Sequence, residues 1–244
     1  MIRVRGLTKR FGAITAVRNL SFDAPNGTIT GLLGANGAGK TTVLRMMSGV
    51  LCPDAGSIQV DQVDAGHHAA AIQQRLGALL DHTGLSARLT AREHLAYFGR
   101  LHHMTSPALE SGVQRMLSAL GLSVIADRRT AGFSQGERMK VALGRAMIHA
   151  PSHLVLDEPT NGLDVPTVRM VRMLLRQLRD EGTCILFSSH VLGEVEELCD
   201  RIIVIARGTL VAAGTRDELC VSSGSRTLEE AFVRWTSQPG ELAC

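Results

Sequence analysis

The chain has 244 residues, of which 45% are hydrophobic and 20% charged, a composition that fits a folded globular protein and excludes a disordered one. Its net charge is +3, and no basic tract exceeds two residues, so an electrostatic surface for nucleic acid is not indicated. Only three of the 26 basic residues are lysines, which makes a lysine inside a motif informative.

Targeting, membrane-spanning and disulfide signals are missing from the sequence. The first twelve residues lack the apolar core of a signal peptide. Apolar runs such as 202–206 are far shorter than the ~20 residues that a membrane span needs. The five cysteines are scattered and form no CxxC pair, which is typical of reduced thiols. We therefore expect a soluble protein.

Short β-branched runs alternate with helical patterns along most of the chain. The predicted strands are residues 28–33, 154–156, 184–188 and 202–206, and the predicted helices are residues 41–48, 165–180 and 191–199. Strands that alternate with helices indicate a mostly parallel α/β sheet. The strands are uniformly apolar, as expected where helices cover both faces.

The pattern changes to helix without strand in residues 84–133, which we interpret as a helical subdomain inserted into one domain spanning 1–244. Thr90 and Glu93 have the spacing of a capping box and predict a helix start. Ser106-Pro107 predicts a second start, with serine as the N-cap. That helix is predicted to end near Gly121.

A helical tail is predicted over residues 217–244. Thr227 and Glu230 repeat the capping-box spacing and predict a terminal helix through Trp235. The two histidine pairs, 67–68 and 102–103, are interpreted as surface residues. Adjacent helical side chains point about 100° apart and rarely share a metal ion.

Residues 34–41, GANGAGKT, fit the phosphate-loop pattern G-x-x-x-x-G-K-[ST], between a predicted strand and a predicted helix. Glycines let backbone N–H groups converge on phosphate oxygens at a helix N-terminus. Lys40 would reach the β- and γ-phosphates, and the Thr41 hydroxyl would ligate Mg²⁺. The alternative is a glycine-rich turn before a helix. The candidate nucleotide-binding residues here are Gly34, Ala35, Asn36, Gly37, Ala38, Gly39, Lys40, Thr41 and Thr42.

A second motif is the apolar strand 154–156, which ends in Asp157 and Glu158. Ligands bind at the carboxyl ends of parallel strands. Asp157 would hold Mg²⁺ through water, and Glu158 would act as the general base toward the attacking water. Many buried strands end in surface acids, so the motif is weak alone. Together with the upstream phosphate loop it indicates nucleotide hydrolysis.

A third motif, FSQGE at residues 133–137, stands directly before a predicted helix. Ser134 is a good N-cap, and Gly136 leaves its backbone N–H open beside a helix N-terminus. Alone, this is a capped helix. Its position between the phosphate loop and the acidic strand indicates that the motif has a functional role besides capping the helix.

Taken together, these motifs resemble the ATP-binding cassette (ABC) ATPases, specifically the nucleotide-binding subunits of ABC transporters. The resemblance covers essentially the whole chain. The family's Walker A motif matches residues 34–41 and its LSGGQ signature matches residues 133–137, in which Ser134 and Gly136 would touch the γ-phosphate of a partner subunit's ATP. The Walker B carboxylate matches Asp157, and the catalytic glutamate matches Glu158.

Further positions follow from the resemblance alone. Asp164 matches the acid of the D-loop, and His190 matches the switch histidine that contacts the γ-phosphate, although a loop histidine would be the default interpretation. Phe11 matches the aromatic residue that stacks on adenine, although it could instead cover a small β-sheet core. Asp81 stands where the family has its Q-loop glutamine, and its carboxylate can still ligate Mg²⁺.

The signature departs from the family at Gln135, where a glycine is usual, and at Glu137, where a glutamine is usual. Glu137 puts a negative charge near the phosphate, yet that charge also gains from the helix dipole. The sequence leaves open which effect dominates the rate of hydrolysis.

The resemblance implies a P-loop NTPase core with an N-terminal antiparallel β subdomain and an inserted helical subdomain. It further implies an ATPase that binds ATP and Mg²⁺, forms a head-to-tail homodimer and drives a separate membrane permease from the cytoplasmic face of the inner membrane. Segments such as LTAREHLAYFGRLH and TLEEAF are most similar to the NatA-type branch of bacterial sodium and drug exporters. The alternatives are a soluble ABC ATPase acting on nucleic acid or the ribosome, and a non-hydrolysing regulatory cassette.

Overall fold

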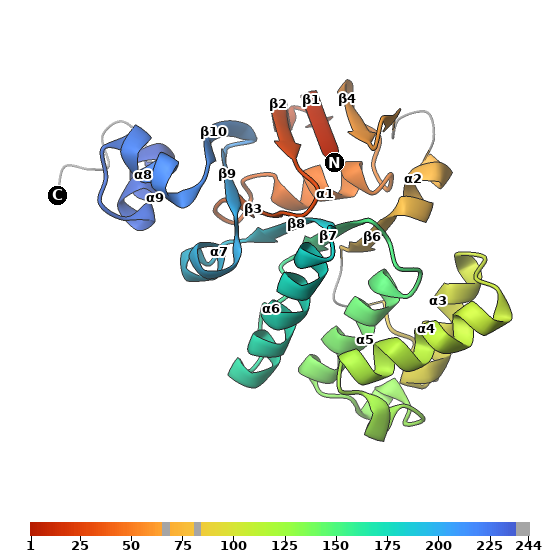
Figure 1. Ribbon diagram of the computed structural model, residues 1–244. Coiled ribbons are helices and arrows are strands. Elements are labelled where there is room, and N and C mark those ends of the chain that lie inside the picture. Colours follow the sequence, from red (N-terminus) through yellow and green to blue (C-terminus); the bar gives the residue numbers. More distant parts are fainter. Residues whose placement is uncertain (65–68, 81–83, 238–244) are drawn as a thin grey trace.

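The computed structural model describes residues 1–64, 69–80 and 84–237, and is built on two β-sheets with helices around them (Figure 1). The larger sheet has the strand order β10-β9-β3-β8-β7-β6. Adjacent strands in this sheet run parallel, except that β10 runs antiparallel to β9. Its strands are β3 (Ile29–Leu33), β6 (Leu76–Leu79), β7 (His153–Asp157), β8 (Cys184–Ser189), β9 (Arg201–Ala206) and β10 (Thr209–Gly214).

Each central strand sends alternate side chains into two separate hydrophobic cores. Leu154 and Leu156 of β7 belong to one core, and Val155 between them belongs to the other. This alternation follows from the two-residue period of a strand. Because both faces are covered, the central strands β3, β7 and β8 are fully buried and mainly apolar, as the sequence predicts.

The first core lies between the large sheet and an antiparallel sheet of order β2-β1-β4-β5. Helix α1 (Lys40–Met47) contributes Val43, Leu44 and Met47 to it, and lies between the two sheets (Figure 1). The strands of the antiparallel sheet are β1 (Ile2–Phe11), β2 (Ile14–Ala24), β4 (Ala55–Val60) and β5 (Val63–Asp64).

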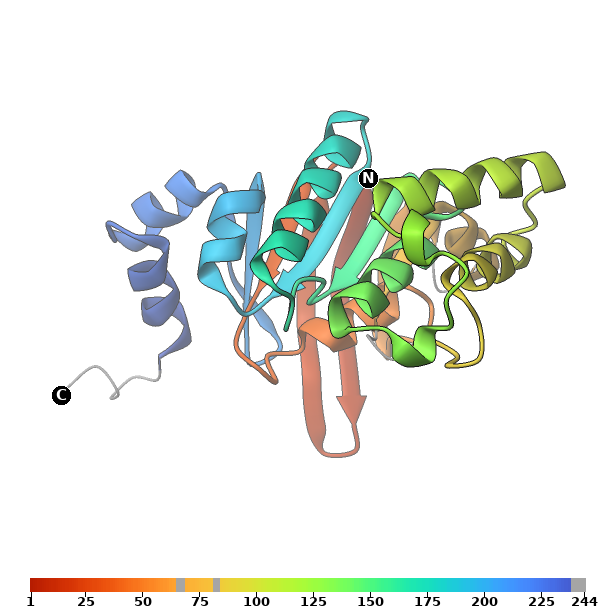
Figure 2. The same cartoon turned by 90° about the horizontal axis from the view of Figure 1, so that it is seen from below.

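The second core covers the opposite face and extends into the helical subdomain, which stands to one side of the sheet (Figure 2). Helix α5 joins the two parts, because its buried residues pack on α3 and on β6. The helices here are α3 (Ala91–Leu101), α4 (Ser106–Ala119), α5 (Gln135–Met147), α6 (Val165–Asp180) and α7 (Leu192–Leu198), with the short turns η1 (Ser123–Ile125) and η2 (Thr130–Gly132). The remaining helices are α2 (Ala69–Arg75), α8 (Arg216–Ser223) and α9 (Leu228–Thr236).

Helix boundaries agree closely with the predicted caps. Thr90 and Glu93 form the predicted reciprocal capping box. The start predicted for α4 is wrong by one residue, since Thr105 is the N-cap and Pro107 is the second helical residue. At α9, Thr227 caps Glu230 N–H as predicted, but the Glu230 carboxylate accepts from Arg226 N–H instead of closing the box.

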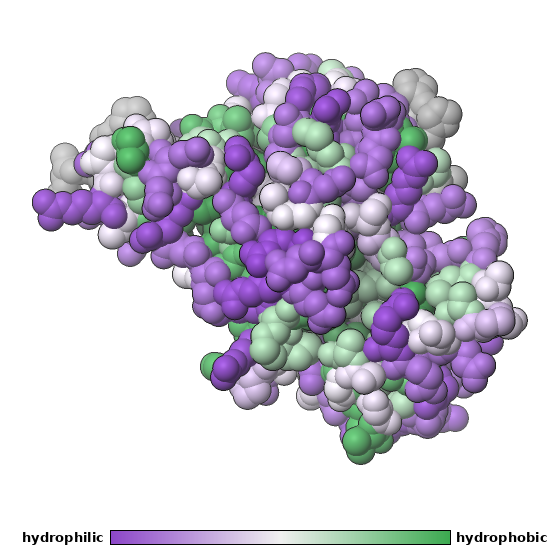
Figure 3. All heavy atoms as spheres, in the orientation of Figure 1, coloured by the Kyte–Doolittle hydropathy of each residue, from purple (hydrophilic) through white to green (hydrophobic). Residues whose placement is uncertain are grey.

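No helix within residues 1–64, 69–80 and 84–237 is long and apolar enough to cross a bilayer. The face in Figure 3 is mostly hydrophilic, with small separate hydrophobic patches. The surface prediction is wrong for His102, which is half-buried and stacks on His149 with ring centroids 3.6 Å apart. His103 is exposed as predicted, and the 67–68 pair lies outside the described residues.

Candidate nucleotide-binding site

The phosphate loop runs from the end of β3 to the start of α1, and two glycines make its path possible. Gly39 is the N-cap of α1 with φ +105°, a conformation that other residues rarely adopt. A Cβ at Gly39 would lie 2.6 Å from the Ala16 carbonyl oxygen, and one at Gly34 would lie 2.6 Å from the Ile205 carbonyl oxygen. The loop therefore packs directly against the backbones of β2 and β9.

This loop forms one wall of an open pocket of about 430 Å³. The other walls come from the carboxyl ends of the large sheet's strands and the turns that follow them. Its lining residues are Ala16, residues 35–42, Glu158, Asn161 and His190. The predicted phosphate-loop residues from Ala35 to Thr42 thus all face one cavity, together with the acid that follows β7.

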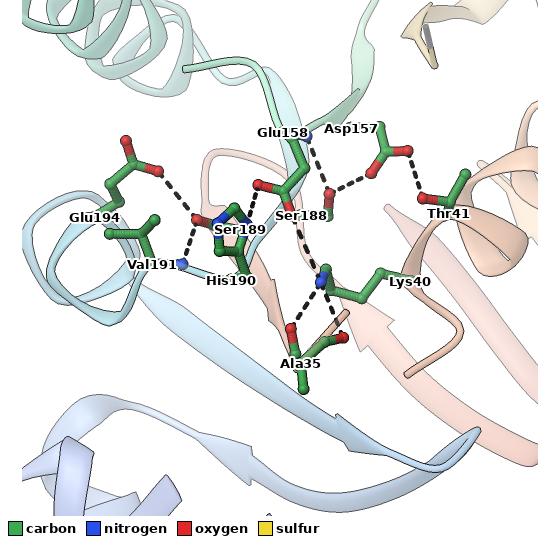
Figure 4. Close-up of polar contacts among 11 residues, drawn as sticks. Ala35, Lys40, Thr41, Asp157, Glu158, Ser188, Ser189, His190, Val191 and Glu194 are labelled. Carbon is green, nitrogen blue, oxygen red and sulfur yellow. Dashed lines mark hydrogen bonds and ion pairs between the residues drawn. The ribbon is translucent and has the colours of Figure 1, made fainter. Parts of the chain in front are cut away.

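Lys40 is buried between the loop and the acidic end of β7 (Figure 4). Its ammonium donates to the carbonyl oxygens of Gly34 at 2.7 Å and Ala35 at 3.3 Å. It also lies 3.5 Å from a carboxylate oxygen of Glu158. These contacts hold the Lys40 ammonium in position, so a phosphate that enters the pocket would meet a preoriented positive charge.

Asp157 lies at the edge of the pocket, where the parallel register pairs it with Ser188 of β8. Its carboxylate accepts from the Thr41 hydroxyl at 2.7 Å and from the Ser188 hydroxyl. The Ser188 oxygen in turn accepts from Glu158 N–H at 3.1 Å. Ser188 was not predicted as a site residue; the available signal was a serine pair ending an apolar strand.

Glu158 adopts an unusual backbone conformation, with φ +48°. Left-handed conformations in residues other than glycine are sparsely populated, cost about 1–3 kcal/mol and concentrate at functional sites. The turn is closed by Asn161 N–H, which donates to the Glu158 carbonyl oxygen at 3.1 Å. The Glu158 carboxylate lies 2.8 Å from His190 Nδ1. The structure thus brings Lys40, Glu158 and His190 together.

The signature segment lies outside this pocket. Ser134 is exposed and caps α5 by accepting from Glu137 N–H at 3.2 Å. The Glu137 carboxylate turns back to accept from Ser134 N–H at 2.7 Å and lies 3.3 Å from the Arg128 guanidinium. Neither Ser134 nor Gly136 lines the chain's own pocket. The charge of Glu137 is therefore compensated within the chain.

The remaining predicted residues are more distant or fall outside the description. Phe11 ends β1, is half-exposed and does not line the pocket. Asp164 caps α6 by accepting from Thr167 N–H at 3.1 Å, and its hydrogen bonds to Thr167 hold the pKa of that carboxyl below its usual range. Asp81 lies outside the described residues.

A glycine-rich loop between a parallel strand and a helix, with an aspartate on the helix's first threonine, defines a P-loop nucleoside triphosphatase. The family model described as "ABC transporter" matches residues 17–161. The ABC transporter ATP-binding protein NatA of Bacillus subtilis is 40% identical over 96% of this chain and 97% of its own length. The daunorubicin resistance ATP-binding protein DrrA3 of Streptomyces coeruleorubidus is 37% identical over 93% of this chain and 72% of its own length. The chain belongs to the ABC transporter family.

Solved structures agree in fold. An ATP-binding subunit of an ABC transporter superposes with a TM-score of 0.90 at 25% identity, covering 97% of this chain and all of that one. The dimeric cassette MJ0796, bound to ADP and Pi in a post-hydrolysis state, superposes with a TM-score of 0.81 at 22% identity. The match covers 88% of this chain and 98% of that one. The fold class predicted from the sequence is confirmed, and the chain is an ATP-binding, ATP-hydrolysing subunit of this family.

Proposed function

We propose that two copies of this chain bind two ATP molecules head to tail and, by hydrolysing them, drive a separate membrane permease. The observation that carries the proposal is the division of the site. The chain's own pocket supplies the phosphate loop and Glu158, whereas Ser134, which is exposed, and Gly136, which is half-buried, do not line it. Each ATP would lie between residues 34–41 of one copy and residues 134–136 of the other.

Within each half-site the residues divide the work. Lys40 would bind the β- and γ-phosphates, and Glu158 would accept a proton from the attacking water. His190, within hydrogen-bonding distance of Glu158, would keep that carboxylate in place and donate toward the γ-phosphate. Phe11 would stack on the adenine and Asp164 would stand at the dimer interface.

A magnesium ion fits the oxygen donors at this edge of the sheet. The Thr41 hydroxyl and the Asp157 carboxylate are 2.7 Å apart, and both are ligands that a hard cation prefers. When bound, Mg²⁺ neutralises charge on the β- and γ-phosphates. Asp81 is proposed as a further oxygen ligand. Ser188, which donates to Asp157, would orient its carboxylate for this role.

A second cavity, of about 550 Å³, supports a docking site for the permease. It lies where the sheet meets the helical subdomain, with Leu80, Leu101 and His149 among its lining residues. Val50 and Leu101 line it and are more than half exposed, so apolar surface is available to a partner. Leu80 directly precedes Asp81 in the sequence, and the segment after Asp81 is the one expected to carry motion to the permease.

The relatives support an exporter. The names of similar proteins include linearmycin resistance and daunorubicin resistance ATP-binding proteins and a Nod factor export ATP-binding protein. We therefore place this chain on the cytoplasmic face of the inner membrane, beside a permease that exports sodium or a drug. The two alternative functions, a nucleic-acid or ribosome ATPase and a regulatory cassette, have no such support in the names of these relatives.

The replacement Glu158→Gln tests the proposal. Without the carboxylate base, ATP should still bind, and ATP-bound dimers should accumulate in gel filtration with ATP and Mg²⁺. The wild-type chain in ADP is the control and should elute as a monomer. A monomeric profile for Glu158→Gln with ATP would contradict the head-to-tail dimer. Strong stimulation of wild-type ATPase by DNA or RNA would favour the nucleic-acid alternative instead.

A further inference from the structure

Gln135 stands where the family signature has a glycine, and its side chain contacts the loop that follows the acidic strand. Its amide nitrogen donates to the Asn161 carbonyl oxygen at 3.3 Å. A Cβ at Gly162, whose φ is +70°, would lie 2.4 Å from that same nitrogen. The Gln135 amide therefore rests directly on the backbone of residues 161–162.

That backbone belongs to the turn of the proposed catalytic base. Asn161 N–H closes the turn by donating to the Glu158 carbonyl oxygen, and Asn161 itself lines the nucleotide pocket. Glu158 holds a left-handed conformation, which persists only where surrounding contacts over-determine it. The hydrogen bond from Gln135 reaches Asn161, the residue that closes this turn, from a segment 26 residues away in sequence.

A second contact joins the same two segments. A Cβ at Gly136 would lie 3.4 Å from the Thr167 hydroxyl, so the start of α5 packs against the start of α6. Thr167 N–H in turn donates to Asp164. The signature end of α5 thus touches both ends of residues 161–167.

We propose that Gln135 is a positioning residue that holds the Glu158 turn, so that engagement of a partner's ATP by the signature segment is transmitted to the chain's own hydrolytic site. This inference rests on the head-to-tail dimer proposed above. In that dimer, Ser134 and Gly136 touch one ATP while Glu158 acts on the other. Gln135 connects these two sites within one chain, a connection that the glycine usual at this position has no side chain to make.

Two replacements separate positioning from helix stability. Gln135→Ala removes the amide. Gln135→Glu keeps the side-chain length and suits the helix N-terminus, but a carboxylate cannot donate to the Asn161 carbonyl oxygen. We expect both variants to lower kcat by about three- to tenfold, the effect of one hydrogen bond, with KM for ATP within twofold. The Hill coefficient for ATP should fall toward 1, while Gln135→Glu unfolds no earlier than the wild type.

A double-mutant cycle with Gly162→Ala tests the contact itself. Alone, Gly162→Ala displaces the Gln135 amide and strains the backbone, so it should lower kcat at least to the level of Gln135→Ala. In the Gln135→Ala background it should add only the effect of backbone strain, so the two changes should be clearly non-additive. Gln177→Ala is the matched control, since this exposed α6 glutamine hydrogen-bonds only to Glu181 among the contacts described.

The inference is overturned if Gln135→Ala and Gln135→Glu keep the wild-type kcat and Hill coefficient, or if their effects add to that of Gly162→Ala. It is also overturned if turnover follows thermal stability across all variants. Failure of the dimer model would show differently, because the wild-type chain would then stay monomeric with ATP and show no cooperativity to lose.

Discussion

Ser188 has two partners in the site, and its replacement by alanine tests the geometry of the acidic strand end. The hydroxyl is fully buried, donates to Asp157 and accepts from Glu158 N–H. Ser188→Ala leaves a buried carboxylate with one donor fewer and a backbone N–H without its acceptor. Unsatisfied buried groups cost about 1–3 kcal/mol each, and we expect a loss of about 2–3 kcal/mol of unfolding free energy. For a chain of this length, Tm should fall by roughly 4–12 °C.

The assay is urea unfolding followed by circular dichroism, with ATPase turnover measured beside it. Turnover should fall about tenfold, because Asp157 and Glu158 both lose orientation. Thr30→Val is the matched control: Thr30 is equally buried, on β3 beside β8, but its hydroxyl has no hydrogen-bond partner among the described residues. That variant should be at least as stable as the wild type. Equal midpoints for Ser188→Ala and wild type would refute the reasoning.

Three further outcomes are expected. Lys40→Ala should abolish nucleotide binding in calorimetry, and an unchanged affinity would remove the phosphate-loop assignment. Phe11→Ala should weaken ATP binding by roughly 1–3 kcal/mol, the value of one stacked base, and leave turnover at saturating ATP unchanged; equal loss of kcat would contradict a stacking role. Burial lowers the pKa of His149 from 6.5 to about 4, so the unfolded chain binds its proton first on acidification. Stability should therefore fall between about pH 6.5 and 4, less steeply in His149→Gln, and unfolding midpoints that do not change with pH would exclude this.

The parallel sheet and its phosphate loop could be predicted because their signals are local. Apolar runs bounded by turn residues define β3, β7 and β8, and the observed ends differ from the predicted ones by a residue or less. The capping box at Thr90 is equally local, since its two members are three residues apart. At α4 the prediction misplaced the cap because Thr105 and Ser106 are adjacent residues that both favour an N-cap.

The contacts that assemble the site depend on tertiary structure and were not predictable from residue type. Ser188 reaches Asp157 only because β7 and β8 are neighbours in register. Gln135 reaches Asn161 only because the starts of α5 and α6 pack together. The balance at Glu137, which the sequence left open, depends on where its carboxylate turns, and in the structure it faces Ser134 N–H and Arg128.

The left-handed backbone at Glu158 has a consequence for protein engineering. Glycine adopts φ +48° without strain, so Glu158→Gly would relieve the backbone while deleting the carboxylate. Selection for heat resistance alone would therefore enrich a variant that binds nucleotide but no longer turns it over. A thermostability screen on this chain therefore needs a simultaneous assay of phosphate release. At position 158, glycine favours the stability of the folded chain, whereas ATP hydrolysis requires glutamate.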